Sequence, residues 1–207
     1  MRTLILFVFV ALAFAATTPF IDMWEEIKDA ACLFKDNKLV NLRVMTDVGK
    51  VDPNFAKNLA IIKKNVTDVK VGAYMVPSPK HNATKQVEQI VHALKGTEIK
   101  MVSIDVEGHK WNKEPEKNVE FLKLLIAEFN KVNIKPAIMT KPNDWTRILG
   151  KTFEELSALP LWWVHHDKDP EAKKFKPFGG WKAPAAKQYD AVTLCDNKVN
   201  KNSMYAA

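Results

Sequence analysis

The chain has 207 residues, of which 47% are hydrophobic, and it carries a formal net charge of +7 at pH 7. This length is one that a single domain usually accommodates. A basic chain is attracted to anionic surfaces. Its lysines, however, are spread along the sequence and accompany no nucleic-acid-binding motif, so the charge does not indicate specific recognition of nucleic acid.

The first 15 residues are typical of a secretory signal peptide. Met1-Arg2 precedes an apolar run from Leu4 to Phe14 that is too short to span a bilayer, and small residues flank Phe14 in Ala13-Phe14-Ala15. We predict cleavage after Ala15, which leaves residues 16–207 as one secreted or endolysosomal domain; a membrane anchor is the alternative. No later apolar run is long enough to cross a membrane, so we expect no stable membrane insertion.

Two kinds of residue fit this secretory route. Cys32 and Cys195 are the only cysteines, and in an oxidising compartment we expect them to form a disulfide, with two buried free thiols as the alternative. Asn65 and Asn82 each begin an Asn-x-Thr sequon, so both are candidate N-glycosylation sites.

Apolar segments rich in β-branched residues alternate along the chain with segments of helical periodicity. Strands are predicted at 20–22, 39–45, 69–75, 99–106, 134–139, 161–165 and around 188–189. Helical stripes are predicted at Phe55-Leu59-Ile62, Val87-Ile90-Val91-Leu94 and Leu122-Leu125-Ile126-Phe129. Alternation of this kind, at about 30 residues per unit, indicates βαβ units and a parallel sheet.

The number of strands favours a closed or nearly closed β/α barrel over an open sheet. No Gly-rich loop follows the first strand, which counts against nucleotide binding, and we expect no cofactor. The segment from His166 to Trp181 is rich in Lys, Pro, Gly and aromatics, and we predict a long ordered loop there.

Polar residues gather where the predicted strands end, which is where barrel enzymes place their active sites. They are Asp22, Pro77, Asp105, Glu107, Thr140 and His165. Adjacent histidines at 165 and 166 point to opposite sides of a strand and have no partners at ligand spacing, so we predict no metal site.

Asp105 and Glu107 are the most informative pair among these residues. Side chains two apart on a strand lie on one face, so both carboxyl groups point the same way while Val106 turns into the fold. Neighbouring carboxyl groups shift each other's pKa, which suits one to act as an acid and the other as an anion, as in glycosidases. The alternative for such a pair is a solvated loop edge.

In this frame the chain resembles glycoside hydrolase family 25, the lysozymes with a modified β/α barrel, and within it the nematode type. The resemblance covers nearly the whole chain after residue 15. The matching segments, in the order of the family, are Phe20-Ile21-Asp22, Gly49-Lys50-Val51-Asp52-Pro53-Asn54, Ala73-Tyr74-Met75-Val76-Pro77, Ser103-Ile104-Asp105-Val106-Glu107-Gly108, Pro160-Leu161-Trp162-Trp163-Val164-His165-His166-Asp167, Pro177-Phe178-Gly179-Gly180-Trp181, Lys187-Gln188-Tyr189 and Thr193-Leu194-Cys195.

The resemblance implies cleavage of the β-1,4 bond between N-acetylmuramic acid and N-acetylglucosamine in bacterial peptidoglycan. By position, Glu107 matches the proposed general acid, Asp105 the carboxylate two residues before it, and Asp22 the acid ending the first strand. Aromatic faces for sugar rings are expected from Tyr74, Trp162, Trp163, Trp181 and Tyr189, although alternation lets only one of the two adjacent tryptophans face a cleft.

The chain departs from the pattern of the family at several positions. Asn200 stands where the family has a late acid, which would lower activity if that acid tunes the site. Lys187 replaces a Trp, and from this we expect weaker stacking on sugars. Ser78 stands where the branch often has Cys, and Met45-Thr46-Asp47 departs from an Arg-x-Tyr-like pattern.

Three functions therefore stay open at this point. The first is a secreted, monomeric muramidase used in antibacterial defence or digestion. The second is a weak or inactive relative that binds glycan or acts as an immune effector. The third is a glycosidase for another N-acetylated polymer.

Overall fold

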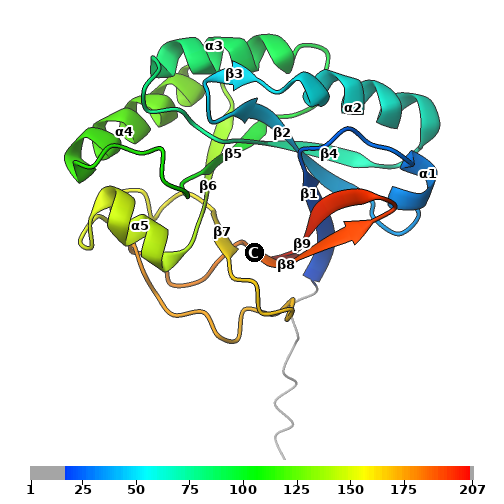
Figure 1. Cartoon of the computed structure of the whole chain (residues 1–207). Coiled ribbons are helices and arrows are strands. Elements are labelled where there is room, and N and C mark those ends of the chain that lie inside the picture. Colours follow the sequence, from blue (N-terminus) through cyan, green and yellow to red (C-terminus); the bar gives the residue numbers. More distant parts are fainter. Residues whose placement is uncertain (1–16, 206–207) are drawn as a thin grey trace, which may run out of the picture.

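The computed structural model describes residues 17–205, so the predicted signal peptide at 1–15 lies outside the described residues (Figure 1). Within this range the chain forms nine strands and five helices. In chain order they are β1 (Thr17–Met23), α1 (Ala30–Leu33), β2 (Leu39–Thr46), β3 (Lys50–Val51), α2 (Pro53–Asn65), β4 (Lys70–Met75), α3 (Ala83–Ala93), β5 (Met101–Asp105), α4 (Pro115–Lys131), β6 (Lys135–Thr140), α5 (Pro142–Leu149), β7 (Leu161–Val164), β8 (Ala186–Leu194) and β9 (Asn197–Tyr205).

Eight of these strands close into a barrel. Their order around it is β1-β9-β8-β7-β6-β5-β4-β2, and β1 then pairs with β2, while β3 is an extra edge strand on β2. All pairs from β2 through β4 to β8 are parallel, but β9 runs antiparallel to both β8 and β1. The predicted single-domain, modified β/α barrel is therefore confirmed, with helices lying outside the ring of strands (Figure 1).

Strand alternation divides the core into two parts. One small cluster contains Phe20, Tyr74, Met139, Trp162, Val164 and Ala186, one or two residues from each of five strands. The intervening residues, such as Ile21, Ile104 and Trp163, belong to the larger cluster that also contains the buried faces of α2 to α5. Because residues two apart share a face of a strand, the small cluster fills the inside of the barrel and the large one lies between strands and helices.

The predicted strands and the three predicted helices are confirmed, but two short helices and two strands were missed. Helix α5 has only eight residues, and its Pro142 at the first turn marks its start without a long apolar stripe. Strand β9 reads Asn197-Lys-Val-Asn-Lys-Asn-Ser-Met-Tyr205, which has few apolar residues because its buried side chains include Asn197, Asn202 and Ser203. A hydrophobicity pattern cannot reveal a strand whose buried face is polar.

Two further predictions concern the outer parts of the fold. Cys32 and Cys195 form a disulfide with their Cα atoms 6.0 Å apart, which joins α1 to the turn between β8 and β9. Residues 166–181 form an irregular segment with an isolated bridge between Phe178 and Trp181, consistent with an ordered loop. Among residues 17–205, no helix is both long and apolar enough to traverse a lipid bilayer.

Candidate active site

Asp105 and Glu107 lie at the carboxyl end of β5, as the sequence pattern indicated. Val106 between them is fully buried; its N–H donates to the carbonyl of Met139 (2.8 Å) and its carbonyl accepts from the Thr140 hydroxyl (2.7 Å). Strand β6 therefore holds this segment in extended register just beyond β5. Since Val106 turns into the fold, the two carboxyl groups share the opposite side.

Asp105 is the less satisfied of the two acids. Its Oδ1 is buried and has no hydrogen-bond partner among the described residues. Burial raises the pKa of Asp105 well above the ordinary 3.8, and the negative charges of Glu107, Asp22 and Asp144 raise it further. Asp105 therefore keeps its proton to a higher pH than an exposed aspartate does.

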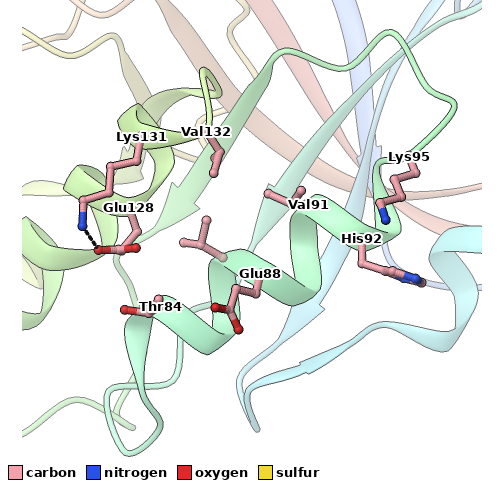
Figure 2. A pocket seen from close by; sticks show the side chains of 9 residues that line it. Thr84, Glu88, Val91, His92, Lys95, Glu128, Lys131 and Val132 are labelled. Atoms are coloured by element: carbon pink, nitrogen blue, oxygen red, sulfur yellow. Dashed lines mark hydrogen bonds and ion pairs between the residues drawn. The ribbon is translucent and has the colours of Figure 1, made fainter.

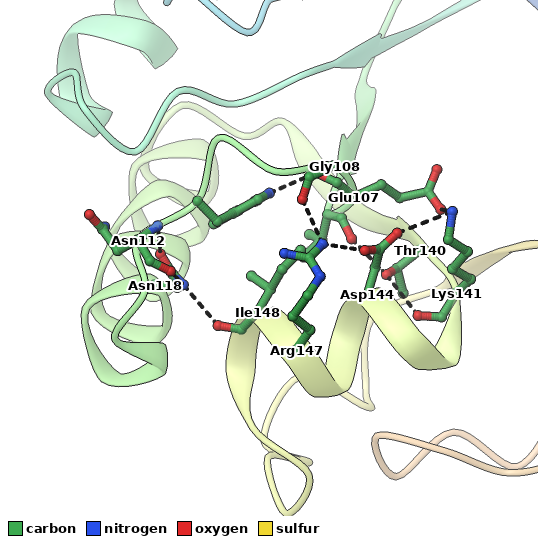
Figure 3. Close-up of polar contacts among 11 residues, drawn as sticks. Glu107, Gly108, Asn112, Asn118, Thr140, Lys141, Asp144, Arg147 and Ile148 are labelled. Carbon is green, nitrogen blue, oxygen red and sulfur yellow. Dashed lines mark hydrogen bonds and ion pairs between the residues drawn. The ribbon is translucent and has the colours of Figure 1, made fainter.

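Glu107 lies beside a cation, unlike Asp105. Its Oε1 is 3.2 Å from Lys141 Nζ, and the same ammonium lies 3.1 Å from Asp144 Oδ2 (Figure 3). Burial raises the pKa of Glu107 above 4.5, and the charge of Lys141 acts in the opposite direction but does not cancel this rise. The Glu107 side chain retains 18% of its exposure, which leaves it within reach of a bound molecule.

Asp22 is held by amide groups from the last two strands of the barrel. Its Oδ1 accepts from Gln188 Nε2 and Asn202 Nδ2, and its Oδ2 accepts from Asn200 Nδ2, each at 2.9 Å. Burial raises the pKa of Asp22 to about 6, against the lowering effect of these three donors and of His166. Asp22 therefore changes charge in mildly acidic solution.

The three predicted acids form one electrostatic cluster. The charge of Asp22 acts on Asp105, and so does that of Glu107, although the three come from β1 and the end of β5. All of them end strands that run parallel around the barrel, so they meet at its carboxyl-terminal mouth. Within the described residues no group of three His, Cys, Asp or Glu side chains is arranged to hold a metal ion.

The five predicted aromatic residues do not lie together. Trp162 points into the barrel, where its indole N–H donates to Asn202 Oδ1 (2.9 Å) and its ring contacts Tyr74 edge-on at 6.3 Å. Both rings are almost fully buried and pack in the small cluster inside the barrel. Tyr189 is half-buried on β8.

Trp163 and Trp181 lie outside the barrel, so the prediction that they present faces to sugar is wrong. Each is at most 4% exposed and belongs to the core between strands and helices. Trp181 packs edge-on against Trp145 and donates to the carbonyl of Leu159, while Trp163 stacks on His165. These buried indoles pack in the core. Strand alternation had predicted that only one of Trp162 and Trp163 could face a cleft.

The interpretation of Lys187 is also corrected. Its side chain is 0% exposed and points out of the barrel, with Nζ 5.0 Å from the centre of the Trp163 ring. The ammonium donates to Asp167 Oδ1 and to the carbonyls of Asp169 and Glu171 at 2.7–2.9 Å. Lys187 therefore fixes the loop after β7, and its replacement of Trp removes no ring from the cluster of acids.

Several residues that contact the acids, or that contact the partners of the acids, were not singled out as site residues from the sequence. They are Lys141, Asp144, Gln188 and Asn202, together with His166, whose Nε2 lies 2.7 Å from Gln188 Oε1. Lys141 directly follows Thr140, which the sequence did place at a strand end. The same rule, extended by one or two residues beyond each strand, finds Lys141 and His166.

Clefts of the surface also lie away from this cluster. One of about 400 Å³ lies between α3 and α4, with Val87, Val91 and Val132 among its lining residues and Glu88, His92, Lys95 and Lys131 also lining it (Figure 2). None of its lining residues belongs to the acidic cluster. The chemistry therefore points to the mouth of the barrel and not to this groove.

A barrel with buried acids at its carboxyl-terminal mouth is a common plan of glycoside hydrolases, and comparisons with known proteins narrow the class. The family model described as lysozyme-like protein 1 matches residues 16–189. Probable GH family 25 lysozyme 2 of Dictyostelium discoideum is 32% identical over 152 residues, which cover 72% of this chain and 71% of the relative. The chain therefore belongs to the glycoside hydrolase family 25 lysozymes.

Solved structures agree with this assignment at the level of the fold. The family 25 lysozyme from Aspergillus fumigatus has a TM-score of 0.74 at 15% identity, covering 93% of this chain and 95% of that one. The modular autolysin LytC from Streptococcus pneumoniae, solved with a synthetic peptidoglycan ligand, has a TM-score of 0.70 at 13% identity. The match covers 91% of this chain but 47% of LytC.

Proposed function

We propose that this protein is a secreted lysozyme that hydrolyses the β-1,4 bond between N-acetylmuramic acid and N-acetylglucosamine in peptidoglycan, in defence or digestion. The observation that carries the proposal is the cluster of Asp22, Asp105 and Glu107 at the mouth of a family 25 barrel. The peptidoglycan ligand on the structurally similar LytC supports the choice of substrate.

The geometry suggests distinct roles for the three acids. The Glu107 side chain retains 18% of its exposure whereas Asp22 is buried, so Glu107 is placed to protonate the leaving oxygen of the glycosidic bond. Asp105 and Asp22, in their ionised forms, supply negative charge opposite the positive charge that develops on the sugar ring. The raised pKa values of all three mean that the cluster retains protons in mildly acidic solution.

A second candidate is a weak or inactive relative that binds glycan. Asn200 favours it, because this residue donates an amide hydrogen to Asp22 at a position where we expected an acid. An amide adds no negative charge to the cluster. In this case Asn200→Asp would raise a low activity, whereas a fully active wild type would gain nothing from it.

The test is muropeptide release from purified peptidoglycan by wild type, Glu107→Gln and Glu120→Gln. Glu107→Gln keeps the shape of the side chain and removes the transferable proton, so we expect at least a 100-fold loss of rate. Glu120, exposed on α4, provides a matched control whose variant should keep the wild-type rate. No release by the folded wild-type protein, with binding to the wall retained, would favour the second candidate.

Secretion is part of the proposal and has a separate test. Expression of the full chain in a eukaryotic secretory host should give a protein in the medium whose first residue is Ala16. Asn65 and Asn82 are both exposed, at the end of α2 and the N-cap of α3, so both are accessible for glycosylation. A shift in mass on treatment with an N-glycosidase identifies whichever is used.

A further inference from the structure

Lys141 stands between the acid of the active site and helix α5. It is the N-cap residue of α5, directly after β6, and its side chain is 47% exposed. Its ammonium lies 3.2 Å from Glu107 Oε1 and 3.1 Å from Asp144 Oδ2, so one cation bridges two carboxylates (Figure 3). Such a bridge favours the ionised form of both acids.

The bridge is itself held in place by the first turns of α5. Asp144 also pairs with Arg147, and Arg147 Nη2 donates to the carbonyl of Gly108 at 2.6 Å (Figure 3). Residues 141, 144 and 147 are three apart, which places them along one side of the helix. Helix α5 thereby fastens both the side chain of Glu107 and the backbone that follows it.

The charges of the network follow from this arrangement. Burial tends to raise the pKa of Asp144, but hydrogen bonds from Arg147 and Lys141 outweigh it, so the pKa is lowered and Asp144 stays ionised. Burial tends to lower the pKa of Lys141, but Glu107 and Asp144 outweigh it, so Lys141 stays cationic. Lys141 therefore presents a positive charge to Glu107 throughout acidic and neutral solution.

Other groups also face Glu107. Asp105 lies beside it on β5, Asp144 faces it from α5, and the charge of His166 reaches it from the segment after β7. The two aspartates favour the protonated acid when they are ionised, and a charged His166 favours the anion. Among the charged groups around Glu107 named here, Lys141 is the one that lies at ion-pair distance from its carboxylate.

We propose that Lys141 is a positioning residue that holds the Glu107 carboxylate in place and restricts proton donation by Glu107 to acidic solution. The inference rests on the proposed role of Glu107 as general acid. A general acid must be protonated when the substrate binds, and a neighbouring cation opposes that state. The protein thereby gains an active site that switches off as the pH rises.

The first test is the pH dependence of kcat/KM on soluble peptidoglycan fragments for wild type, Lys141→Met and Lys141→Arg. Lys141→Met should move the descending limb at high pH upward by about one pH unit, the lower end of the usual effect because Lys141 is half exposed. Lys141→Arg keeps the charge and should restore the wild-type limb. All three proteins share His166, so its presence does not distinguish them.

Two more variants separate charge from structure. Asp144→Asn removes an anion near Glu107, so it should move the same limb downward, opposite to Lys141→Met. Lys110→Met removes an exposed lysine that pairs with Asp47 and should leave the profile unchanged. If Lys141→Met is active with an unmoved limb, or if Lys141→Arg fails to restore it, the proposal is overturned.

A second measurement does not depend on catalysis. The Cδ carbon of Glu107, labelled with ¹³C and assigned by its loss in Glu107→Gln, reports protonation directly by NMR. Its titration midpoint should rise in Lys141→Met and return in Lys141→Arg; equal midpoints in all three would refute the pairing. If no variant releases muropeptides but the midpoint moves as expected, the proposed function fails while the Lys141–Glu107 pairing stands.

Discussion

Asp105 is an acid of the candidate site that destabilises the folded protein when it is ionised. A buried acceptor without a hydrogen-bond partner costs free energy, and more when it is charged. Its raised pKa means that the folded protein keeps a proton that the unfolded chain releases. The stability of the wild type on this account is greatest below the ordinary pKa of 3.8 and falls as the pH rises through the folded value.

Asp105→Asn should therefore stabilise the folded protein while it impairs the site. We expect a gain of about 1 kcal/mol in the free energy of unfolding near pH 7.5, shrinking towards pH 4, where the wild-type carboxyl group is neutral as well. Urea unfolding at the two pH values measures it. Asp47→Asn, at an exposed ion pair with Lys110, is the control and should change stability by no more than about 0.5 kcal/mol. A loss of stability in Asp105→Asn at pH 7.5 would contradict the argument.

For single residues, the sequence predicts which side chains lie at the ends of strands. It does not predict which way a side chain points. Asp22, Asp105 and Glu107 follow from the rule that barrel sites lie at the carboxyl ends of strands. The outward direction of Trp163 was one of two outcomes that alternation allowed. Trp181 lies in an irregular segment, where no periodicity tells inside from outside, so its burial required the structure.

Among the elements, the loop between β7 and β8 is held in place by one buried side chain. Lys187 on β8 donates to Asp167 and to two loop carbonyls, and it lies over the Trp163 ring. Burial tends to raise the pKa of Asp167, but hydrogen bonds from Lys187, the Asp169 backbone and Lys174 outweigh it and lower the pKa. The density of aromatics in the sequence predicts an ordered loop, but it gives no sign of the cation beneath it.

Lys187→Met should release this loop. Removing the cation leaves a carboxylate and two carbonyls without their donor, and breaking such a pair costs about 3 kcal/mol, the low end of the range because Lys174 also pairs with Asp167. Urea unfolding gives the cost, and trypsin should cut faster at Lys173 and Lys174. Lys182→Met, at an exposed lysine in the same region, is the matched control. Unchanged proteolysis in Lys187→Met would show that the loop is held by its aromatics instead.

The whole molecule depends on pairing between its two ends. The first strand, β1, pairs with the last, β9, so that Thr17 lies opposite Tyr205 and Asp22 opposite Asn200. Parallel βαβ units are legible in the sequence because each apolar strand is followed by a helical stripe. The antiparallel β9 has no such stripe and buries asparagines, so neither the closure of the barrel nor the amide shell of Asp22 could be derived from hydrophobic periodicity.

The disulfide also joins two segments of the fold that are far apart in the sequence. Cys32 and Cys195 are 163 residues apart and join α1 to the β8–β9 turn, next to the strand that supplies the amides around Asp22. A covalent link over so long a segment restricts the unfolded chain, and a loop of this size corresponds to roughly 5 kcal/mol in the chain-entropy account, an amount that real disulfides often do not reach in full. The molecule therefore gains stability from a bond that touches none of the three acids.

Replacing both cysteines, as Cys32→Ser with Cys195→Ser, should lower the free energy of unfolding by roughly 3–5 kcal/mol. Urea unfolding of this variant, beside wild type with and without reductant, measures the effect, and reduced wild type should behave like the variant. Because the bond acts mainly on the unfolded chain, muropeptide release well below the unfolding transition should keep its wild-type rate. A variant as stable as oxidised wild type would show that strand pairing alone closes the barrel, whereas a stable variant with lost activity would show that the bond positions β9 and its amides around Asp22.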